Sequence, residues 1–219
     1  MLSLLDRTIE TEALGSVRTC MAHTINSVGK YDAGKAVALL KRLLAKDLRI
    51  ITAHATRHML NWAVHDYPDD VSEIIDALLK SGNKGLEANG YFLESLLALL
   101  DEGRNRKFVA GFKGNVLRRQ MAAYRGAGNV GSHRHGERAA GWLLTLFNDR
   151  SAQVRADTVK IEWGEVLDGP TDRSPFVRAY LSAPVFDEQS DHLIRALESR
   201  VSQWPYLTFD AVEKVLDLS

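Results

Sequence analysis

Hydrophobic side chains recur at helical spacing along almost the whole chain. In the segments 36–44, 72–79, 92–100 and 139–147, apolar residues stand three and four positions apart, which places them on one face of a helix. No segment alternates between apolar and polar residues as a half-buried strand between two turns would. The pattern therefore predicts an all-α protein.

Five prolines indicate where this helical pattern is interrupted. Proline has no backbone N–H, and its ring clashes with the preceding helical turn, so it is disfavoured inside a helix. Breaks are therefore expected near Pro68, Pro170, Pro175, Pro184 and Pro205. Four of the five prolines follow residue 169, which sets the last part of the chain apart from the rest.

A six-residue string recurs at an interval typical of two-helix repeats. The string V-R-T-C-M-A at 17–22 returns with substitutions at 48–53, 117–122 and 154–159, and a degenerate copy lies at 86–91. Successive copies are 31, 38, 31 and 37 residues apart. One helical pair cannot bury both of its apolar faces, so neighbouring pairs are expected to stack. Each copy is predicted to open the first helix of a pair.

The second helices of these pairs follow from the segments between the copies. Asp47 and Asp149 precede two of the strings and are expected to cap or nearly cap the helices that start there. The segment near 104–115 is poorly defined as a helix. The second helices are predicted at 32–46, 69–81, 104–115 and 136–148.

Two of the strings carry a likeness to a known repeat family. The sequences D-R-S-A-Q-V-R at 149–155 and K-D-L-R at 46–49 resemble the HEAT-repeat family, and the resemblance covers 16–168. It implies an α-solenoid of antiparallel helical hairpins. We accordingly expect one HEAT-like domain over 1–219, which has three parts. These are an N-terminal capping helix at 1–15, repeats at 16–168 and divergent C-terminal helices at 169–219.

The segment after the repeats has a different character. S-P-F-V-R-A-Y-L-S-A-P-V-F at 174–186 precedes a predicted helix at 191–198, then W-P-Y-L at 204–207 and a final helix to Leu216. Such a tail after HEAT-like pairs is similar to the C-terminal helical arms of large bacterial nucleotide-binding signalling and defence ATPases. That resemblance implies a sensor or scaffold arm, and a chain that is a fragment or a split partner of such an ATPase.

Charge and cysteine content narrow the classes of function. The 219 residues include 28 basic and 28 acidic ones, and proteins that bind the phosphate backbone usually carry a basic surplus. The single cysteine, Cys20, excludes an intrachain disulfide and a cysteine-rich zinc site. No apolar run approaches the ~20 residues that span a bilayer, and the N-terminus lacks a basic leader. We expect a soluble cytoplasmic protein without a membrane partner.

Two motifs carry candidate chemistry that their context does not favour. The glycine pattern G-x-G-x-x-G at 126–131 follows a helical segment, whereas a dinucleotide-binding loop follows a strand, so a flexible loop is expected. His54 and His58 lie four positions apart and share a helix face, with His23 in the matching column of the first string. A metal site is one interpretation and packing in a helix interface is the other. We expect no catalytic residue, cofactor or metal.

One cluster of basic residues is the best candidate for contact with a partner. Phe108, Phe112 and Tyr124 interleave with it, as aromatic residues do in surfaces that bind nucleic acid or acidic proteins. The other interpretation is a solvated face with ion pairs to Asp101 and Glu102. Three further residues, in the glycine-rich loop, could contact an anion. The candidate residues are Arg104, Arg106, Lys107, Lys113, Arg118, Arg119, Arg125, His133, Arg134 and His135.

These features favour a non-enzymatic scaffold or sensor-type module that binds a protein partner, since solenoids present long binding surfaces. The alternative is a HEAT-like nucleic-acid-binding protein, similar in size and helical content to DNA alkylation-repair glycosylases. For that alternative the chain offers Glu162, Trp163 and the basic cluster at 104–125. Trp62, Trp142, Trp163 and Trp204 are expected to anchor the core between repeats.

Overall fold

All regular secondary structure in the described part of the chain is helical. The computed structural model describes residues 2–169, 171–188 and 190–218, and it has helices of α or 3-10 type throughout those ranges. The prediction of an all-α protein is confirmed. None of the described helices is both long and apolar enough to cross a membrane. The break predicted near Pro170 lies outside the described residues.

The contacts within the chain divide it into two compact units. Unit 1 extends to Arg104 and unit 2 begins at Asn105. The boundary falls inside α7 (Glu102–Ala110), in the segment that the sequence pattern leaves poorly defined. The single domain expected over 1–219 stays a prediction.

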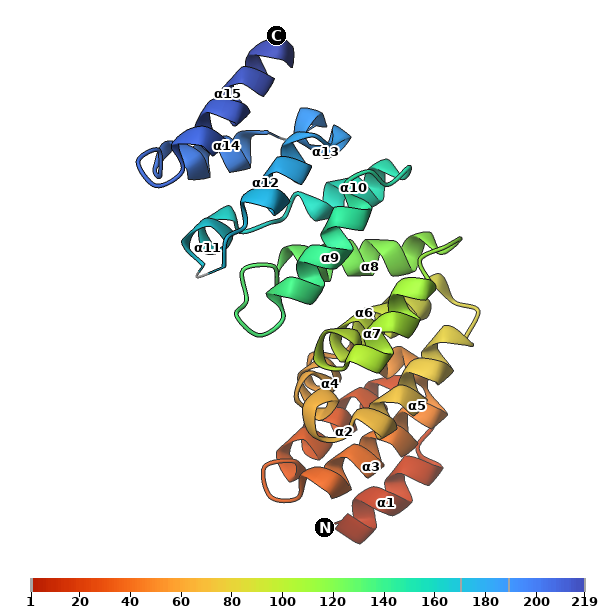
Figure 1. Ribbon diagram of the computed structural model, residues 1–219. Coiled ribbons are helices and arrows are strands. Elements are labelled where there is room, and N and C mark those ends of the chain that lie inside the picture. Colours follow the sequence, from red (N-terminus) through yellow and green to blue (C-terminus); the bar gives the residue numbers. More distant parts are fainter. Residues whose placement is uncertain (1, 170, 189, 219) are drawn as a thin grey trace. The chain divides into compact units, whose positions relative to one another are not determined.

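In unit 1 each helix packs against its neighbour and against the helix after that (Figure 1). Contacts join α1 to α3 and α3 to α5 in one row, and α2 to α4 and α4 to α6 in the other. Pairs of consecutive helices, such as α2 with α3 and α5 with α6, link the two rows. The elements are α1 (Leu2–Thr11), α2 (Gly15–Val28), α3 (Ala33–Lys46), η1 (Leu48–Thr52), α4 (His54–Asp66), α5 (Pro68–Leu79) and α6 (Lys84–Leu100).

The core of unit 1 is aliphatic. Leu39, Leu40, Leu43 and Leu44 of α3 are all almost completely buried, because α3 has neighbours on several sides. Each such side chain contributes roughly 1.5–3 kcal/mol by leaving water. The predicted second helices at 32–46 and 69–81 therefore form, as α3 and α5.

In unit 2 most helices are shorter, and several contacts join helices that are three places apart in chain order. Contacts join α8 to α9 and α10, α9 to α12, and α15 to both α12 and α14. The predicted helices at 136–148 and 191–198 correspond to α9 and α14. The remaining elements are α8 (Val116–Ala127), α9 (Gly136–Leu146), α10 (Ala152–Thr158), α11 (Trp163–Asp168), α12 (Ser174–Leu181), α13 (Pro184–Glu188), α14 (Asp191–Glu198) and α15 (Pro205–Leu218).

Aromatic side chains dominate the core of unit 2. Trp163 and Tyr180 lie 4.7 Å apart between ring centroids, and Phe108 and Trp142 lie 5.1 Å apart. Burial raises the pKa of the Tyr180 phenol. The Trp142 indole N–H donates to Asn105 Oδ1 at 2.8 Å. Trp142 and Trp163 are thus the core anchors that the sequence predicts.

The other two tryptophans are half-buried. Trp62 lies in unit 1, where it meets Tyr67 edge to face at 6.3 Å, and Trp204 lies in unit 2 just before α15. The four tryptophans therefore divide unevenly, one in unit 1 and three in unit 2.

Prolines and capping residues set the helix boundaries. Pro68, Pro184 and Pro205 are each the first residue of a helix, and Pro175 is the second residue of α12. Proline is favoured there because the first helical N–H groups have no partner inside the helix. The Asp32 side chain accepts from the Lys35 N–H at 2.9 Å at the start of α3.

One recurring string does not open an α-helix as predicted. Residues Leu48–Thr52 form the 3-10 helix η1, and α4 begins only at His54. Asp47 caps this turn by accepting from the Arg49 N–H at 3.0 Å, and its carboxylate also binds the Arg49 guanidinium. This local bond favours a tight turn over an α-helix. Asp149, by contrast, accepts from the Ser151 N–H at 2.8 Å just before α10, close to the predicted capping role.

Candidate functional site

Arg104, the first member of the predicted basic cluster, is the last residue of unit 1 and binds the start of α5 in the same unit. It lies in the first turn of α7, and its guanidinium donates to Asp69 at 2.8 Å, to Ser72 Oγ and to the Pro68 carbonyl. All three acceptors lie at the start of α5. A guanidinium with these partners joins the last residue of unit 1 to the start of α5.

Arg119 has a comparable connecting position inside unit 2. Its Nε donates to the Asp149 carboxylate at 2.6 Å, and its terminal nitrogen donates to the Phe112 carbonyl at 2.8 Å. The side chains of Arg119 and Asp149 are only 18% and 7% exposed. The Arg118 guanidinium lies 5.8 Å from the centroid of the Phe108 ring. Burial lowers the pKa of Arg125 to about 10, so it is still protonated at neutral pH.

Most aromatic residues between these bases belong to the core. Phe108 is fully buried and Phe112 is nearly so, and the two rings meet edge to face. Tyr124 is exposed, with Lys160 Nζ 5.2 Å from its ring centroid. The exposed bases of the cluster are Arg106, Lys107 and Lys113.

Two glycines of the pattern at 126–131 allow close packing. A Cβ at Gly131 would lie 2.6 Å from the Glu165 Cβ, and a Cβ at Gly126 would lie 3.1 Å from Leu143 Cγ. The segment begins in the last turn of α8 and ends before α9, so it lacks the strand of a dinucleotide-binding unit. The glycines at 126 and 131 are thus explained by packing.

The loop after these glycines borders a small hollow of about 80 Å³. His133 and Arg134 are exposed and His135 is half-buried. The buried Arg173, which also lines the hollow, is paired with Glu137 at 3.0 Å.

Two histidines of unit 1, His54 and His58, stack on each other along one helix, α4. The His54 and His58 rings of α4 stack with centroids 6.4 Å apart, and His58 Nδ1 lies 3.3 Å from Asn26 Oδ1 of α2. His23 is exposed on α2. In the described ranges, no three His, Cys, Asp or Glu side chains are grouped so that they could hold a metal ion.

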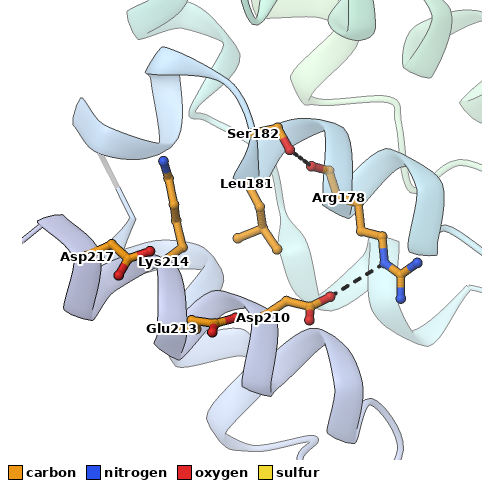
Figure 2. Close-up of a pocket in the computed structure, with 7 residues that line it drawn as sticks. All are labelled: Arg178, Leu181, Ser182, Asp210, Glu213, Lys214 and Asp217. Atoms are coloured by element: carbon orange, nitrogen blue, oxygen red, sulfur yellow. Dashed lines mark hydrogen bonds and ion pairs between the residues drawn. The ribbon is translucent and has the colours of Figure 1, made fainter.

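A larger groove lies between α12 and α15 in unit 2 (Figure 2). Its volume is about 520 Å³. Arg178 of α12 pairs with Asp210 of α15 at 3.5 Å, whereas Lys214 pairs with Asp187 of α13 at 3.7 Å. The groove is lined by Arg178, Leu181, Ser182, Asp210, Glu213, Lys214 and Asp217.

Beside this groove, α15 exposes large apolar side chains. Tyr206, Phe209, Val212 and Leu216 are 79%, 67%, 46% and 68% exposed. Their spacing of three, three and four residues places them along one side of the helix. The sequence analysis missed this surface, because it recorded a helix to Leu216 without assigning its faces. The 3-3-4 spacing in the sequence indicates an apolar face, but not whether a neighbouring element covers it.

Each of these two hollows in unit 2 therefore contains one ion pair, and the exposed apolar surface lies on α15. Arg178 pairs with Asp210 in the larger hollow and Arg173 with Glu137 in the smaller one. Comparisons of the chain with protein-family models, with curated proteins and with solved structures each found no match.

Proposed function

We propose that this protein is a non-enzymatic scaffold: an α-solenoid of HEAT-like antiparallel helical hairpins that binds a protein partner. Repeat proteins of this kind stack two-helix units so that each unit contacts only its neighbours. Long surfaces for protein contact then follow from the repetition. The proposal extends to a sensor or scaffold arm of the type found in large bacterial ATPases.

One observation carries the proposal: nonlocal side-chain bonds join residues about one repeat apart. In unit 1, Arg42 binds Asp6 and Arg104 binds Asp69, across 36 and 35 positions. In unit 2, Trp142 binds Asn105 across 37 positions. These separations match the 31 to 38 residues between successive recurring strings.

Further bonds in unit 2 have the same separation. Arg119 reaches Asp149 across 30 positions, and Arg200 reaches Asp168 across 32. Bonds at one repeat length are what nearest-neighbour stacking produces, and the two rows of helices in unit 1 agree with it. Together they support a stacked repeat in each unit.

The nucleic-acid alternative has weaker support from the same residues. Trp163 is 2% exposed and packs against Phe176 and Tyr180, so its ring is not presented for stacking on a base. Phe108 and Phe112 are buried as well. A protein partner is therefore the preferred proposal.

The test is a pull-down with the tagged full chain from the source cell, with and without nuclease. We expect a protein at near-stoichiometric yield that resists nuclease. Nuclease-sensitive nucleic acid in the eluate, or saturable duplex binding at low salt, would favour the alternative. Release of free base from an alkylated duplex by the purified chain would overturn the non-enzymatic proposal.

A further inference from the structure

The helix α15 has two apolar faces, and only one of them is covered. On the inner face Leu207 and Ala211 are buried, and the helix contacts α12 and α14. On the outer face lie Phe209, Val212 and Leu216, all well exposed. A helix at a protein surface normally carries polar residues opposite its buried stripe. The outer face of α15 instead has the composition of a helix interface.

An acidic ridge runs along α15 next to this outer face. Asp210, Glu213 and Asp217 follow each other at three- and four-residue intervals and all line the groove toward α12 (Figure 2). Asp210 is paired with Arg178. Glu213 and Asp217 are exposed and have no cation partner among the described residues. Two carboxylates beside an apolar stripe thus face solvent.

The groove beside the ridge has room for a long side chain. Its volume of about 520 Å³ lies between α12 and α15, and Leu181 lines it as an apolar surface. Lys and Arg side chains combine an apolar stem with a charged end. Such a side chain can lay its stem against Leu181 and bring its charge to Glu213 or Asp217.

We propose that the outer face of α15 and its acidic ridge bind an amphipathic helix of a partner protein, one with basic residues beside its apolar stripe. The inference rests on the proposed scaffold function and names the chemistry of the partner. Amphipathic helices dock their apolar face on such surfaces through anchors at three- and four-residue spacing. Opposite charges at the edge then set the orientation of the helix and speed its association.

The charge of this face disfavours two other binding partners, a second copy of the chain and a membrane surface. In a two-fold dimer through α15, the outer face and acidic ridge of one copy would contact those of the other. The exposed described residues of α15 include two acids and no base. The one lysine of the helix, Lys214, is paired with Asp187. Cytoplasmic membrane surfaces are anionic and repel an acidic ridge. A partner helix with basic residues beside its apolar stripe can contact both the outer face of α15 and the acidic ridge.

The first experiment titrates the full chain against two labelled probes by fluorescence anisotropy. One probe is a Leu/Lys amphipathic helix of about 18 residues, and the other is the same peptide with Glu in place of Lys. We expect the Leu/Lys helix to bind at least about tenfold more tightly, and its binding to weaken as salt rises. Equal binding of the two probes would overturn the proposal.

Two variants and two matched controls locate the binding. Phe209→Ser/Val212→Ser should weaken the Leu/Lys helix at least about tenfold. Glu213→Lys/Asp217→Lys should reverse the preference and favour the Leu/Glu helix, an effect that a general loss of structure would not produce. The controls Leu144→Ser and Glu162→Lys change exposed residues of the same unit and should leave binding unchanged. Equal losses in variants and controls would overturn the assignment.

Other outcomes separate this inference from the scaffold proposal. If the partner captured by the wild-type chain also binds Phe209→Ser/Val212→Ser, the scaffold proposal stands and the role of α15 is wrong. If the wild-type chain captures no protein, the scaffold proposal fails. The peptide titration then tests binding at the outer face of α15 on its own. Self-association that Phe209→Ser abolishes, or binding to anionic vesicles that it abolishes, would replace the basic helix with that occupant.

Discussion

The first and last helices, α1 and α15, are alike on their inner faces and different on their outer faces. Each buries two apolar side chains, Leu5 and Ile9 in α1 and Leu207 and Ala211 in α15. Among the described outward side chains of α1, only Leu4 is a large exposed apolar residue. The outer face of α15, by contrast, carries three of them. A buried inner face therefore does not determine whether the outer face of the same helix is polar or apolar.

The ion pairs that hold the two helices to their units also differ in length. Glu10 of α1 accepts from Arg42 at 2.8 Å and from Lys46 at 2.7 Å, and Asp6 accepts from Arg42 at 2.5 Å. The ion pairs around α15 are longer, at 3.5 Å for Arg178 with Asp210. The N-terminal capping helix expected at 1–15 stays a prediction.

The largest expected effect concerns the buried side chains on the inner faces of α1 and α15. Ile9→Ala and Leu207→Ala should each lower the free energy of unfolding by about 2–5 kcal/mol, because both side chains are buried and leave a cavity. Urea unfolding followed by far-UV circular dichroism gives both values. A loss below about 1 kcal/mol for Leu207→Ala, with a normal loss for Ile9→Ala, would mean that α15 adds little to its unit.

The second prediction concerns the charged anchorage of α1. Arg42→Ala removes one of the two cation partners of both Asp6 and Glu10, but the Arg42 side chain is 43% exposed. The free energy of unfolding should fall only slightly, as for other exposed ion pairs, and the loss should shrink at high salt. Lys80→Ala is the control, since its pair with Asp76 is 4.0 Å long and highly exposed. A loss that salt does not change would contradict an electrostatic cause.

A smaller effect follows from the pKa of Glu10. Hydrogen bonds from Lys46 and then Arg42 lower this pKa from 4.5 to about 2. A carboxyl group with a lower pKa in the folded state stabilises above the unfolded value, and this contribution is lost as pH falls from 4.5 toward 2. Glu10→Gln should therefore be less stable than wild type near pH 6 and close to it only below about pH 2. Urea midpoints at the two pH values measure this, and a deficit independent of pH would contradict it.

The smallest expected change in stability belongs to the outer faces. Phe209→Ser and Leu4→Ser should both leave the free energy of unfolding within about 0.5 kcal/mol of wild type, because both side chains are exposed. Binding of a hydrophobic dye should fall for Phe209→Ser and stay nearly the same for Leu4→Ser. A large loss of stability in Phe209→Ser would show that this face is covered in solution.

Local features of the fold could be predicted from the sequence because their causes are local. The helix predicted at 191–198 forms as α14 with those bounds, and the one at 32–46 forms after the Asp32 cap. At 48–53 the Asp47 side chain bonds to the Arg49 N–H and produces a 3-10 turn. An apolar pattern alone does not reveal that competing bond.

The candidate site was harder to predict because it depends on distant neighbours. Arg104 and Arg119 stand in one basic run in the sequence, yet each binds an acid 30 or more positions away. The apolar residues of α15 look like core in the sequence, because the pattern does not tell which face a neighbour covers. The exposure of Phe209 follows from how α15 packs in the folded chain, which leaves this side chain uncovered.

The uneven placement of the tryptophans determines what an optical probe of unfolding will detect. Three of the four indoles, including the buried Trp142 and Trp163, lie in unit 2, and unit 1 has only the half-buried Trp62. Intrinsic emission will therefore follow mainly unit 2. A transition confined to unit 1 would leave most of the emission unchanged while the helical signal in the far ultraviolet falls.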